Sequence, residues 1–515
     1  TGTPQAVYSA AGGGNWRNKA TWKYLDGSAA AYFPTGIVDA YITGGLVNAD
    51  SNARAKNLTI NAGGNLSLSA SKTLKVVENL LIKSDATSTG SFVDLGTTTV
   101  TGTTTVERYM TGNWDGNWPP ATITWHYVAS PVSGSTINAF WGGLLNYWNE
   151  PVTTWSPLTW PVTTPLVVNQ GYSAAMPWNG VITYTGGTLN TGNRSITGLT
   201  NTDASAGRGF NLVGNAFPSA IKWNTSITLT NVDASAYLWN GSDYSEYLTT
   251  DPVNFEIPAG QGFFVHVKAG QTTGSMTIPN SNRTHSTQAY LKAVAATEKL
   301  TLAVSGNNLA DETSIRINSS ATKEFDSEYD AYKMWGTDAC PQIYSMIPAT
   351  NLAINSLPEL TPQMVVALGF KAGVTDTYSL AASGLETFPT GTDFYLEDLL
   401  LNKIQNLGTN PVYEFSASPG NPAHRFNLHF APYTGIPNTT AGNMTIYASE
   451  NSVYVNIPMD LHGEIFVYDL LGKEVTHKPI AGNSLNRVDL NVQLGYYLVK
   501  VLGDKATVSG KVFIR

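Results

Sequence analysis

Short runs in which apolar and polar residues alternate are the dominant pattern of this chain. The pattern is densest after residue 444, where Val453, Val455 and Ile457 fall on one side of a predicted strand. It recurs in three later segments, in the sets Ile465 and Val467, Tyr497, Val499 and Val501, and Val512 and Ile514. A period of two with β-branched and aromatic residues is typical of strands that bury one face. With a hairpin turn at 469–472, this C-terminal segment is predicted to be a small all-β sandwich.

Four stretches of this segment occur in a recognisable order. They are VYDLLGKEV (467–475), an Asn-x-Val-x-Leu stretch (486–490), GYYLVKV (495–501) and KVFIR (511–515). Together they resemble the type A C-terminal sorting domain of substrates of the type IX secretion system of Bacteroidetes. Many members open with a Pro-Asn-Pro turn, where this chain has IYASENSVYV, an opening that also occurs in the family. The alternative is an ordinary immunoglobulin-like domain at the end of a secreted chain.

The resemblance implies a destination rather than an activity. It implies passage through the periplasm, export across the outer membrane, and release or attachment at the cell surface. The implied partners are the type IX translocon and an outer-membrane shuttle protein. On the matched stretches, the residues taken to carry the sorting signal are Asp469, Gly472, Gly495, Tyr496, Tyr497, Val499, Val501, Lys511, Val512, Ile514 and Arg515.

The N-terminal 110 residues show a different pattern of apolar and turn residues. Apolar triplets with turn residues between them begin at Leu58, Leu66 and Leu74. Strands this short cannot bury a face alone, so they are expected to stack on the next turn of the chain. We therefore predict a short β-solenoid over 1–110, with a meandering sheet as the alternative.

Residues 111–290 contain an internal repeat. HYVASPVSGSTI (126–137) is similar to FNLVGNAFPSAI (210–221), and each is followed by a Trp-Asn step and then a Gln-Gly-aromatic strand. Duplicated β-sandwich units are therefore predicted here, either as two halves of one sandwich or as two packed domains. Seven or more strands with turn signals between them predict another β-sandwich over 291–436. The linker and sorting domain occupy 437–515, so the fold class expected for the whole chain is all-β.

Composition narrows the function classes. Charged residues make up 13% of the 515, and the net charge of −8 lacks the basic footprint of a nucleic-acid binder. One cysteine, Cys340, rules out an intramolecular disulfide. No apolar run reaches the roughly 18 residues of a membrane helix. Since Thr1 is not Met and no signal peptide precedes it, we expect a mature chain.

Motifs for enzyme chemistry are not recognisable in the sequence. The seven histidines show no metal-ligand spacing, and no nucleophile elbow, phosphate loop or dinucleotide fingerprint occurs. We find no paired carboxylates of the glycosidase type. The sequence therefore predicts a protein that is not an enzyme and has no cofactor.

Two residue groups are candidates for binding. Asp326, Glu328 and Asp330 alternate in a predicted strand, where they form either a calcium site or a solvated acidic edge that discourages strand pairing. Most of the 13 tryptophans lie between 114 and 239. Trp155 and Trp160 stand among prolines, so we expect them on loops, where their rings could stack on the sugars of a surface glycan.

These observations lead to one main hypothesis. The chain is predicted to be a secreted cell-surface adhesin or structural protein, exported by the type IX system and lying on the outer face of the outer membrane. A glycan-binding module and a cryptic polysaccharide-degrading enzyme are the alternatives. A role in gliding motility would fit this class of cargo, but no residue points to it.

Overall fold

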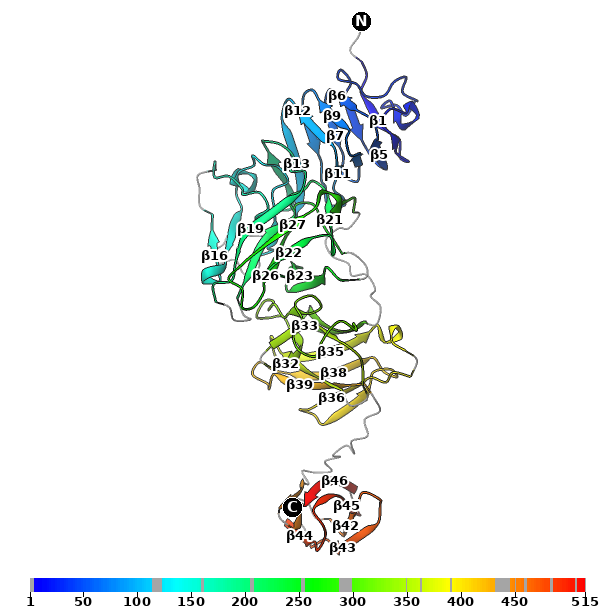
Figure 1. The fold of residues 1–515 in the computed structure, drawn as a ribbon, viewed down its shortest axis with the longest axis vertical. Coiled ribbons are helices and arrows are strands. Elements are labelled where there is room, and N and C mark those ends of the chain that lie inside the picture. The colour runs from blue at the N-terminus through cyan, green and yellow to red at the C-terminus, as the bar shows by residue number, and fades with distance from the viewer. Residues whose placement is uncertain are drawn as a thin grey trace. The chain divides into compact units, whose positions relative to one another are not determined.

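A computed structural model describes residues 4–113, 123–158, 162–203, 208–251, 255–286, 299–348, 350–361, 364–389, 391–430, 445–449, 451–457, 461–481, 485–504 and 507–514 (Figure 1). The regular elements of these residues are strands and five short 3₁₀ helices, with no α-helix among them. The all-β expectation is therefore confirmed. The chain divides into two compact units, Thr1–Glu359 with Lys371–Phe388 and Glu414–Asn421, and Leu360–Phe370 with Pro389–Tyr413 and Pro422–Arg515.

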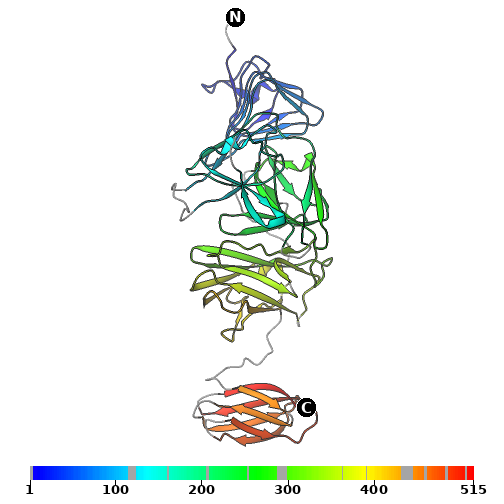
Figure 2. The same cartoon turned by 90° about the vertical axis from the view of Figure 1, so that its left-hand side faces the viewer.

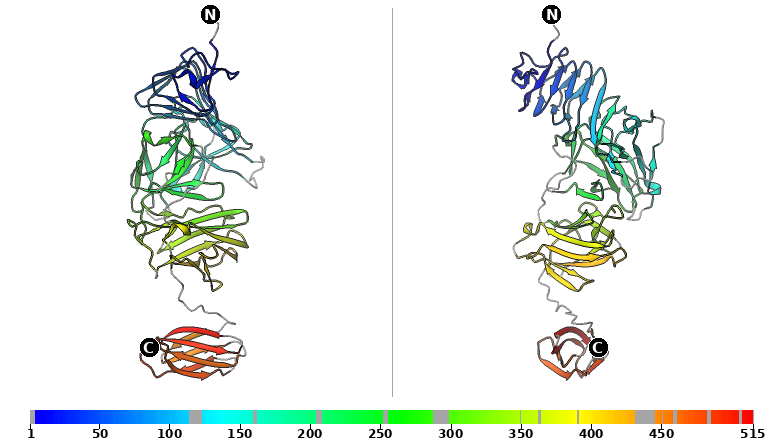
Figure 3. Two further views of the ribbon diagram at one scale, coloured as in Figure 1. Left: turned by 90° about the vertical axis from the view of Figure 1, so that its right-hand side faces the viewer. Right: turned by 180° about the vertical axis from the view of Figure 1, so that it is seen from behind.

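The first unit begins with three sheets of parallel strands (Figure 3). The first contains, in order, β1 (Val7–Ser9), β4 (Ala40–Ile42), β7 (Leu58–Ile60), β10 (Leu80–Ile82) and β13 (Thr104–Met110). The second contains β2 (Gly14–Asn15), β5 (Leu46–Ala49), β8 (Asn65–Leu68) and β11 (Ser91–Asp94), and the third β6 (Ala53–Ala55), β9 (Thr73–Val76) and β12 (Thr97–Val100). The chain visits the three sheets in turn, so each strand pairs with one from the previous pass.

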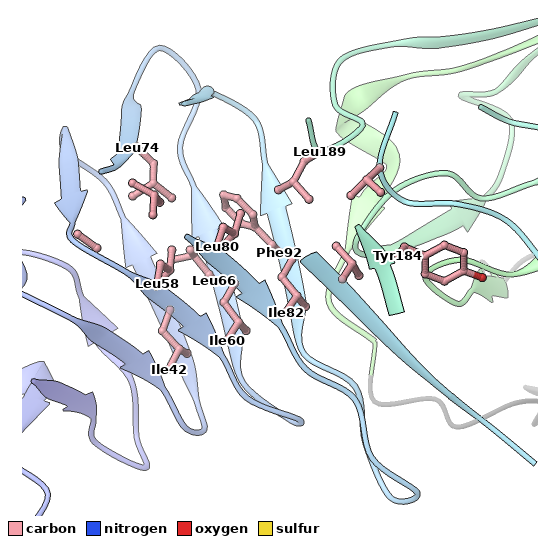
Figure 4. Packing of buried hydrophobic residues seen from close by; sticks show 14 of the residues in the cluster. Ile42, Leu58, Ile60, Leu66, Leu74, Leu80, Ile82, Phe92, Tyr184 and Leu189 are labelled. Atoms are coloured by element: carbon pink, nitrogen blue, oxygen red, sulfur yellow. The ribbon is translucent and has the colours of Figure 1, made fainter. Parts of the chain in front are cut away.

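Like residues stack in columns inside these sheets. Leu58 pairs with Leu80 and Ile60 lies between Ile42 and Ile82 in register, all of them buried (Figure 4). In the second sheet Leu66 is in register with Phe92. Each triplet offers only one or two apolar side chains, so a core exists only when successive passes stack.

The ends of the first sheet are closed by antiparallel strands. β3 (Trp22–Lys23) pairs with β1, and β18 (Gly180–Thr185) pairs with β13 along its length. At the start, Trp22 donates from its ring nitrogen to the Trp16 carbonyl at 2.8 Å, and both rings are buried. The Trp16 and Trp22 pair thus forms the N-terminal end of this core.

The last strand of the second sheet, β11, is covered by polar side chains instead. Arg283, which begins β28 (Arg283–Thr284), donates to the Phe92 carbonyl at 2.5 Å and to the Asp94 carbonyl at 2.7 Å. The Asp94 carbonyl also accepts from Thr191 Oγ1 and Asn280 Nδ2. An open strand edge is a template for unwanted pairing, and these donors occupy the carbonyls that would take part in it.

The repeat predicted in 111–290 corresponds to two sheets with the same strand order. One is β14 (His126–Val128), β17 (Tyr172–Ala175), β15 (Leu144–Asn149) and β16 (Thr154–Pro157). The other is β20 (Phe210–Gly214), β26 (Gly262–Val267), β23 (Val232–Trp239) and β24 (Tyr244–Leu248). The three matched stretches fall on corresponding strands of the two sheets.

The Gln-Gly step of each half contacts the first strand of the other half. Gln261 bridges Val128 on β14, and Gln170 bridges Val213 on β20. A Cβ at Gly171 would lie 2.5 Å from the Val213 carbonyl oxygen, so this approach requires glycine. The Gln-Gly-aromatic repeat therefore reflects a reciprocal contact between the halves.

Smaller sheets accompany these two. One contains β19 (Arg194–Thr200), β27 (Thr273–Ile278) and β22 (Thr228–Thr230), and another β25 (Phe255–Ile257), β21 (Ala220–Trp223) and β28. Further along the first unit, the strand order is β32 (Gln342–Ile347), β33 (Thr350–Leu357), β30 (Leu309–Ile317), β29 (Lys299–Gly306) and β35 (Asp376–Ser383). The short β31 (Ala331–Tyr332) pairs with β33. Strand β38 covers Val412–Ala417.

The second unit contains two groups of strands. In the first, the order is β34 (Val365–Lys371), β39 (His424–His429), β36 (Tyr395–Asp398) and β37 (Lys403–Asn406). In the second, a sheet of β40 (Thr445–Ser449), β41 (Ser452–Asn456) and β44 (Leu485–Asp489) accompanies a sheet of β43 (Glu474–Pro479), β42 (Gly463–Tyr468), β45 (Gly495–Gly503) and β46 (Thr507–Ile514) (Figure 2). The alternating residues identified in the sequence form one buried cluster of this group.

His285 lies against the last two strands of the second parallel sheet, and its protonation is expected to affect the stability of this part of the chain. Its ring nitrogens bond Ser67 Oγ on β8 and Ser91 Oγ on β11, each at 2.8 Å. Burial, reinforced by the charge of Arg283, lowers the pKa of His285 to about 4. An unfolded histidine takes up its proton near pH 6.5, so the folded state loses stability as the pH falls from there towards 4.

We therefore predict that acid destabilises the wild-type chain more than the His285→Gln variant. Between pH 7.5 and pH 4 the extra loss should reach about 3 kcal/mol, and it should be absent above pH 7. The measurement is the urea midpoint at each pH, followed by tryptophan fluorescence. Parallel curves for the two chains would contradict the assignment.

Candidate functional site

The C-terminal four-stranded sheet separates the predicted signal residues into two groups. Tyr497, Val499 and Val501 on β45, and Val512 and Ile514 on β46, are buried in the domain core. Their side chains hold the two sheets together and do not face a partner of the folded domain. The outward positions of the same strands include Tyr496 and Lys511, together with Leu498 and Phe513, which sequence analysis did not select.

Tyr496 and Phe513 are neighbours in register and form an exposed aromatic pair. Their ring centroids are 4.9 Å apart in an edge-to-face arrangement, and the side chains are 50% and 41% exposed. Lys511 Nζ lies 4.3 Å from the centre of the Tyr496 ring. The alternation that predicted the buried residues already places Tyr496 and Phe513 on the opposite side, which is the signal by which Phe513 could have been found.

The outward side of β42 continues this surface. Phe466 and Tyr468 stack with centroids 6.1 Å apart, and His477 of β43 lies 5.5 Å from Phe466. Leu498 is in register with Tyr468 on one side and with Lys511 on the other. We call the set Phe466, Tyr468, Tyr496, Leu498, Lys511 and Phe513 the aromatic face. In this set Tyr496 and Phe513 are exposed, whereas Phe466, Tyr468 and Leu498 are half-buried. Apolar side chains gathered at a surface are typical of an interaction site.

Asp469 and Gly472 build the hairpin between β42 and β43, as the sequence predicts. Asp469 Oδ1 accepts from the Leu471 and Lys473 amides at 2.9 Å, and Gly472 has a φ of +82°. The residues at the tip, Leu470 and Leu471, are 59% and 96% exposed. Gly495 begins β45 half-buried, and Arg515 lies outside the described residues.

Trp155 is not on a loop, and this expectation was wrong. It lies on β16 directly opposite Trp148 of β15, with ring centroids 5.2 Å apart. It also contacts Tyr127 at 5.5 Å and is 36% exposed. The chain turns back through the 3₁₀ helix Glu150–Val152, so the proline-rich appearance of the segment hides a strand pair. Trp160 lies outside the described residues.

Trp141 and Trp178 are the most exposed of the tryptophans that the structure describes, at 64% and 58%. The Trp178 ring lies beside Gly142, the residue after Trp141, since a Cβ at Gly142 would be 3.3 Å from that ring. Their sequence neighbours are turn residues, Gly142 and Gly143 after one and Asn179 and Gly180 after the other. That context was a better indicator of exposure than the prolines around Trp155.

The acidic segment is also not a strand. The amides of Tyr329 and Asp330 both donate to the Asp326 carbonyl, so the chain turns here instead of extending as an acidic edge. Asp330 is buried, accepts from the Asp326 and Ser356 amides at 2.7 Å, and has its pKa raised by burial to about 7. Glu328 is exposed.

Calcium binding at this segment stays a prediction. Among the described residues, no group of three or more His, Cys, Asp or Glu side chains is arranged to hold a metal ion. Asp326 and Asp330 have carboxylate oxygens engaged with backbone amides. Any cation here would compete with those bonds.

A buried group of charges was missed by sequence analysis. Lys333 lies against Asp311 and Asp243, and the charges of Lys333, Asp243 and Asp311 act on the buried carboxyl of Glu246. The four residues come from three separate stretches of sequence. Only the tertiary structure brings them together, and no spacing in the chain could have indicated the group.

Comparison with known families decides the role of the C-terminal domain. Residues 436–515 match the family described as secretion system C-terminal sorting domain. This is a type IX sorting domain of type A. The chain is therefore a substrate of the type IX machinery, secreted or displayed at the cell surface. The aromatic face lies on this sorting domain.

The preceding residues are matched by a family without an assigned role. Residues 233–430 match a domain of unknown function, DUF8693, and this range includes all four residues of the buried charge group. No curated protein matches the chain. Within the described residues, none of the helices has the length and apolar character needed to cross a membrane.

We predict that substitutions on the two sides of the sorting-domain sheet change the stability of the domain by different amounts. Val499→Ala removes buried methyl groups and should destabilise the domain by about 2 kcal/mol. Tyr496→Ser, on the exposed side, should change its stability by less than about 0.5 kcal/mol. Hydrogen exchange of the 495–503 amides in the full chain measures both. Equal acceleration of exchange in the two variants would show that Tyr496 belongs to the core.

Proposed function

We propose that this chain is a non-enzymatic adhesin or structural protein of the outer face of the outer membrane. Its export signal is the sorting domain, and the rest of the chain is the part displayed. Support comes from the strand-rich construction and the small share of charged residues, 13%, which suit an extracellular scaffold.

The aromatic face is the part of the sorting domain that we assign to the translocon and its shuttle protein. The observation that carries this assignment is the exposed Tyr496 and Phe513 pair with Lys511 above it. Exposed aromatic rings beside a cation are the residues that dominate protein interfaces, because they bury a large area with little loss of side-chain freedom. The buried signal residues act by maintaining the sheet that presents this face.

The displayed part is proposed to be modular. We interpret the three parallel sheets as a short β-solenoid, the two sheets of the repeat and the later strands as β-sandwich domains, and the sorting domain as immunoglobulin-like. The columns of Leu58 with Leu80 and of Ile60 with Ile82 support the first interpretation. In such a solenoid each pass of the chain buries the apolar side chains of its neighbours, so the passes stabilise one another.

Glycan binding is a second candidate, favoured by the exposure of Trp141 and Trp178. Both rings are open to solvent, the Trp178 ring lies beside Gly142, which follows Trp141, and exposed aromatic rings can stack on sugars. This moves the candidate site from Trp155, which packs in an aromatic cluster, to the Trp141 and Trp178 pair.

The export assignment predicts a graded loss of surface display. In a type IX-competent Bacteroidetes host, deletion of 444–515 should leave the chain in the periplasm. The double variant Tyr496→Ser, Phe513→Ser should fold and yet reach the surface at least tenfold less than wild type, measured by surface proteolysis and fractionation. Val412→Ser, an exposed apolar position outside the sorting domain, is the control. Normal display of the double variant would refute the role of the aromatic face.

The glycan candidate predicts binding that depends on two rings. A glycan array probed with the full chain should show binding that the double variant Trp141→Ala, Trp178→Ala reduces at least tenfold. Trp335→Ala removes another exposed tryptophan, 46% exposed, and should bind as wild type does. A negative array with the wild-type chain would remove this candidate and leave the structural role.

A further inference from the structure

The buried charge group contains a lysine and a carboxyl group in contact. Lys333 Nζ, just after β31, lies 2.6 Å from Asp311 Oδ1 on β30, and the two side chains are 0% and 1% exposed. Asp243 Oδ2, from the residue before β24, lies 3.5 Å from the same Nζ, and its side chain is 1% exposed. Taking such charges out of water costs several kcal/mol per ion, so their placement here needs an explanation.

Backbone and amide donors fix the orientation of the two carboxyl groups. Asp311 Oδ2 accepts from the Ile343 amide at 2.6 Å, and Oδ1 accepts from the Glu312 amide at 2.7 Å. Asp243 Oδ2 accepts from Gln342 Nε2 at 3.2 Å. The bonds to Asp311 hold its side-chain carboxyl group next to Lys333 and draw electron density from the carboxyl carbon.

The group holds more carboxyls than its one lysine can balance. Asp243, Glu246 and Asp311 share Lys333, and burial raises the pKa of Asp311 and of Glu246 well above the ordinary values. Burial opposes the charge on Lys333, but the carboxylates of Asp311, Glu246 and Asp243 outweigh it and raise the lysine pKa. Among the described residues, the buried atoms Asp243 Oδ1 and Glu246 Oε1 accept no hydrogen bond. Burial thus favours the protonated form of Asp311 and of Glu246, beside the amine of Lys333.

We propose that Lys333 and Asp311 condense into an intramolecular isopeptide bond, with Asp243 as the acid and base that moves the protons. The proposal rests on the contact between Nζ and the Asp311 carboxyl, on the complete burial of both side chains and on the third carboxyl beside them. It is independent of the proposed surface function.

The reaction is balanced without an external reagent. Proton transfer from the Lys333 ammonium through Asp243 to Asp311 Oδ1 gives a neutral amine facing a neutral carboxylic acid. The amine attacks the side-chain carboxyl carbon of Asp311, while the Ile343 amide stabilises the charge that develops on Asp311 Oδ2. The C–Oδ1 bond then breaks, Asp243 returns the proton taken from nitrogen to the departing oxygen, and one water leaves. An ammonium and a carboxylate have become one amide and one water.

Two physical effects favour the bond in this position. The Lys333 amine is held 2.6 Å from an oxygen of the carboxyl group that it would attack, which is worth the large effective concentration of a well-oriented intramolecular reaction. The product replaces a buried ion pair by a neutral amide, so the cost of keeping two charges away from water disappears. The cross-link would also close the loop between β30 and β31 and restrict the unfolded chain, as a disulfide does in other extracellular proteins.

The decisive measurement is the intact mass of the purified wild-type chain. We expect a mass lower than that of the sequence by one water. Tryptic mapping should then show no cleavage after Lys333, and one branched peptide containing both Asp311 and Lys333. A mass equal to the sequence, or a loss of water with the Asp311 and Lys333 peptides separate, would overturn the proposal.

Variants assign the roles. Lys333→Arg keeps the charge but cannot form the amide, so its mass should equal its sequence, and Lys371→Arg, the same change at an exposed position, should retain the loss of water. Asp243→Asn removes the proton carrier and should leave at least nine-tenths of the chain unreacted. Full condensation in that variant would exclude Asp243 from the step. The wild-type mass decides the bond itself even where a variant fails to fold.

Discussion

Every strand in this protein needs a partner along its edges, and the structure depends on how those edges are closed. The described residues contain no α-helix, and a single cysteine leaves no disulfide to tie one sheet to the next. Unpaired carbonyls and amides would invite pairing with other chains, which is a hazard for a secreted protein. Closure is achieved by antiparallel strands at the ends of the first sheet and by Arg283 on β11.

The same constraint explains the internal repeat. Each half supplies a Gln-Gly step that meets the first strand of the other half, through Gln170 with Val213 and Gln261 with Val128. Glycine is needed because the two backbones approach within the space of a side chain. The one repeated motif therefore covers an edge strand in each half, β20 in one and β14 in the other.

Burial separates the residues that stabilise the fold from the exposed residues that we propose to bind partners. In the sorting domain the division follows the alternation of β45, where Val499 is inside and Tyr496 outside. In the first unit it separates Trp155, packed against Trp148, from the exposed Trp141 and Trp178. The buried Lys333 and Asp311 contact belongs to neither class, because it combines full burial with two reactive groups. A covalent bond would resolve that conflict by removing both charges.

The sequence by itself determined the strands, the strand-rich class and the sorting domain. Alternation with a period of two is a local property, so each of the stretches quoted for 453–514 contains a strand with the predicted side buried. It failed for 324–330, where Asp326 closes a turn, because the hydrogen bonds of a short acidic segment do not appear in its alternation. Tertiary structure alone decided which exposed rings lie together and that Lys333 meets Asp311, Asp243 and Glu246. Those contacts join residues far apart in the chain, and their energies depend on burial that no local pattern encodes.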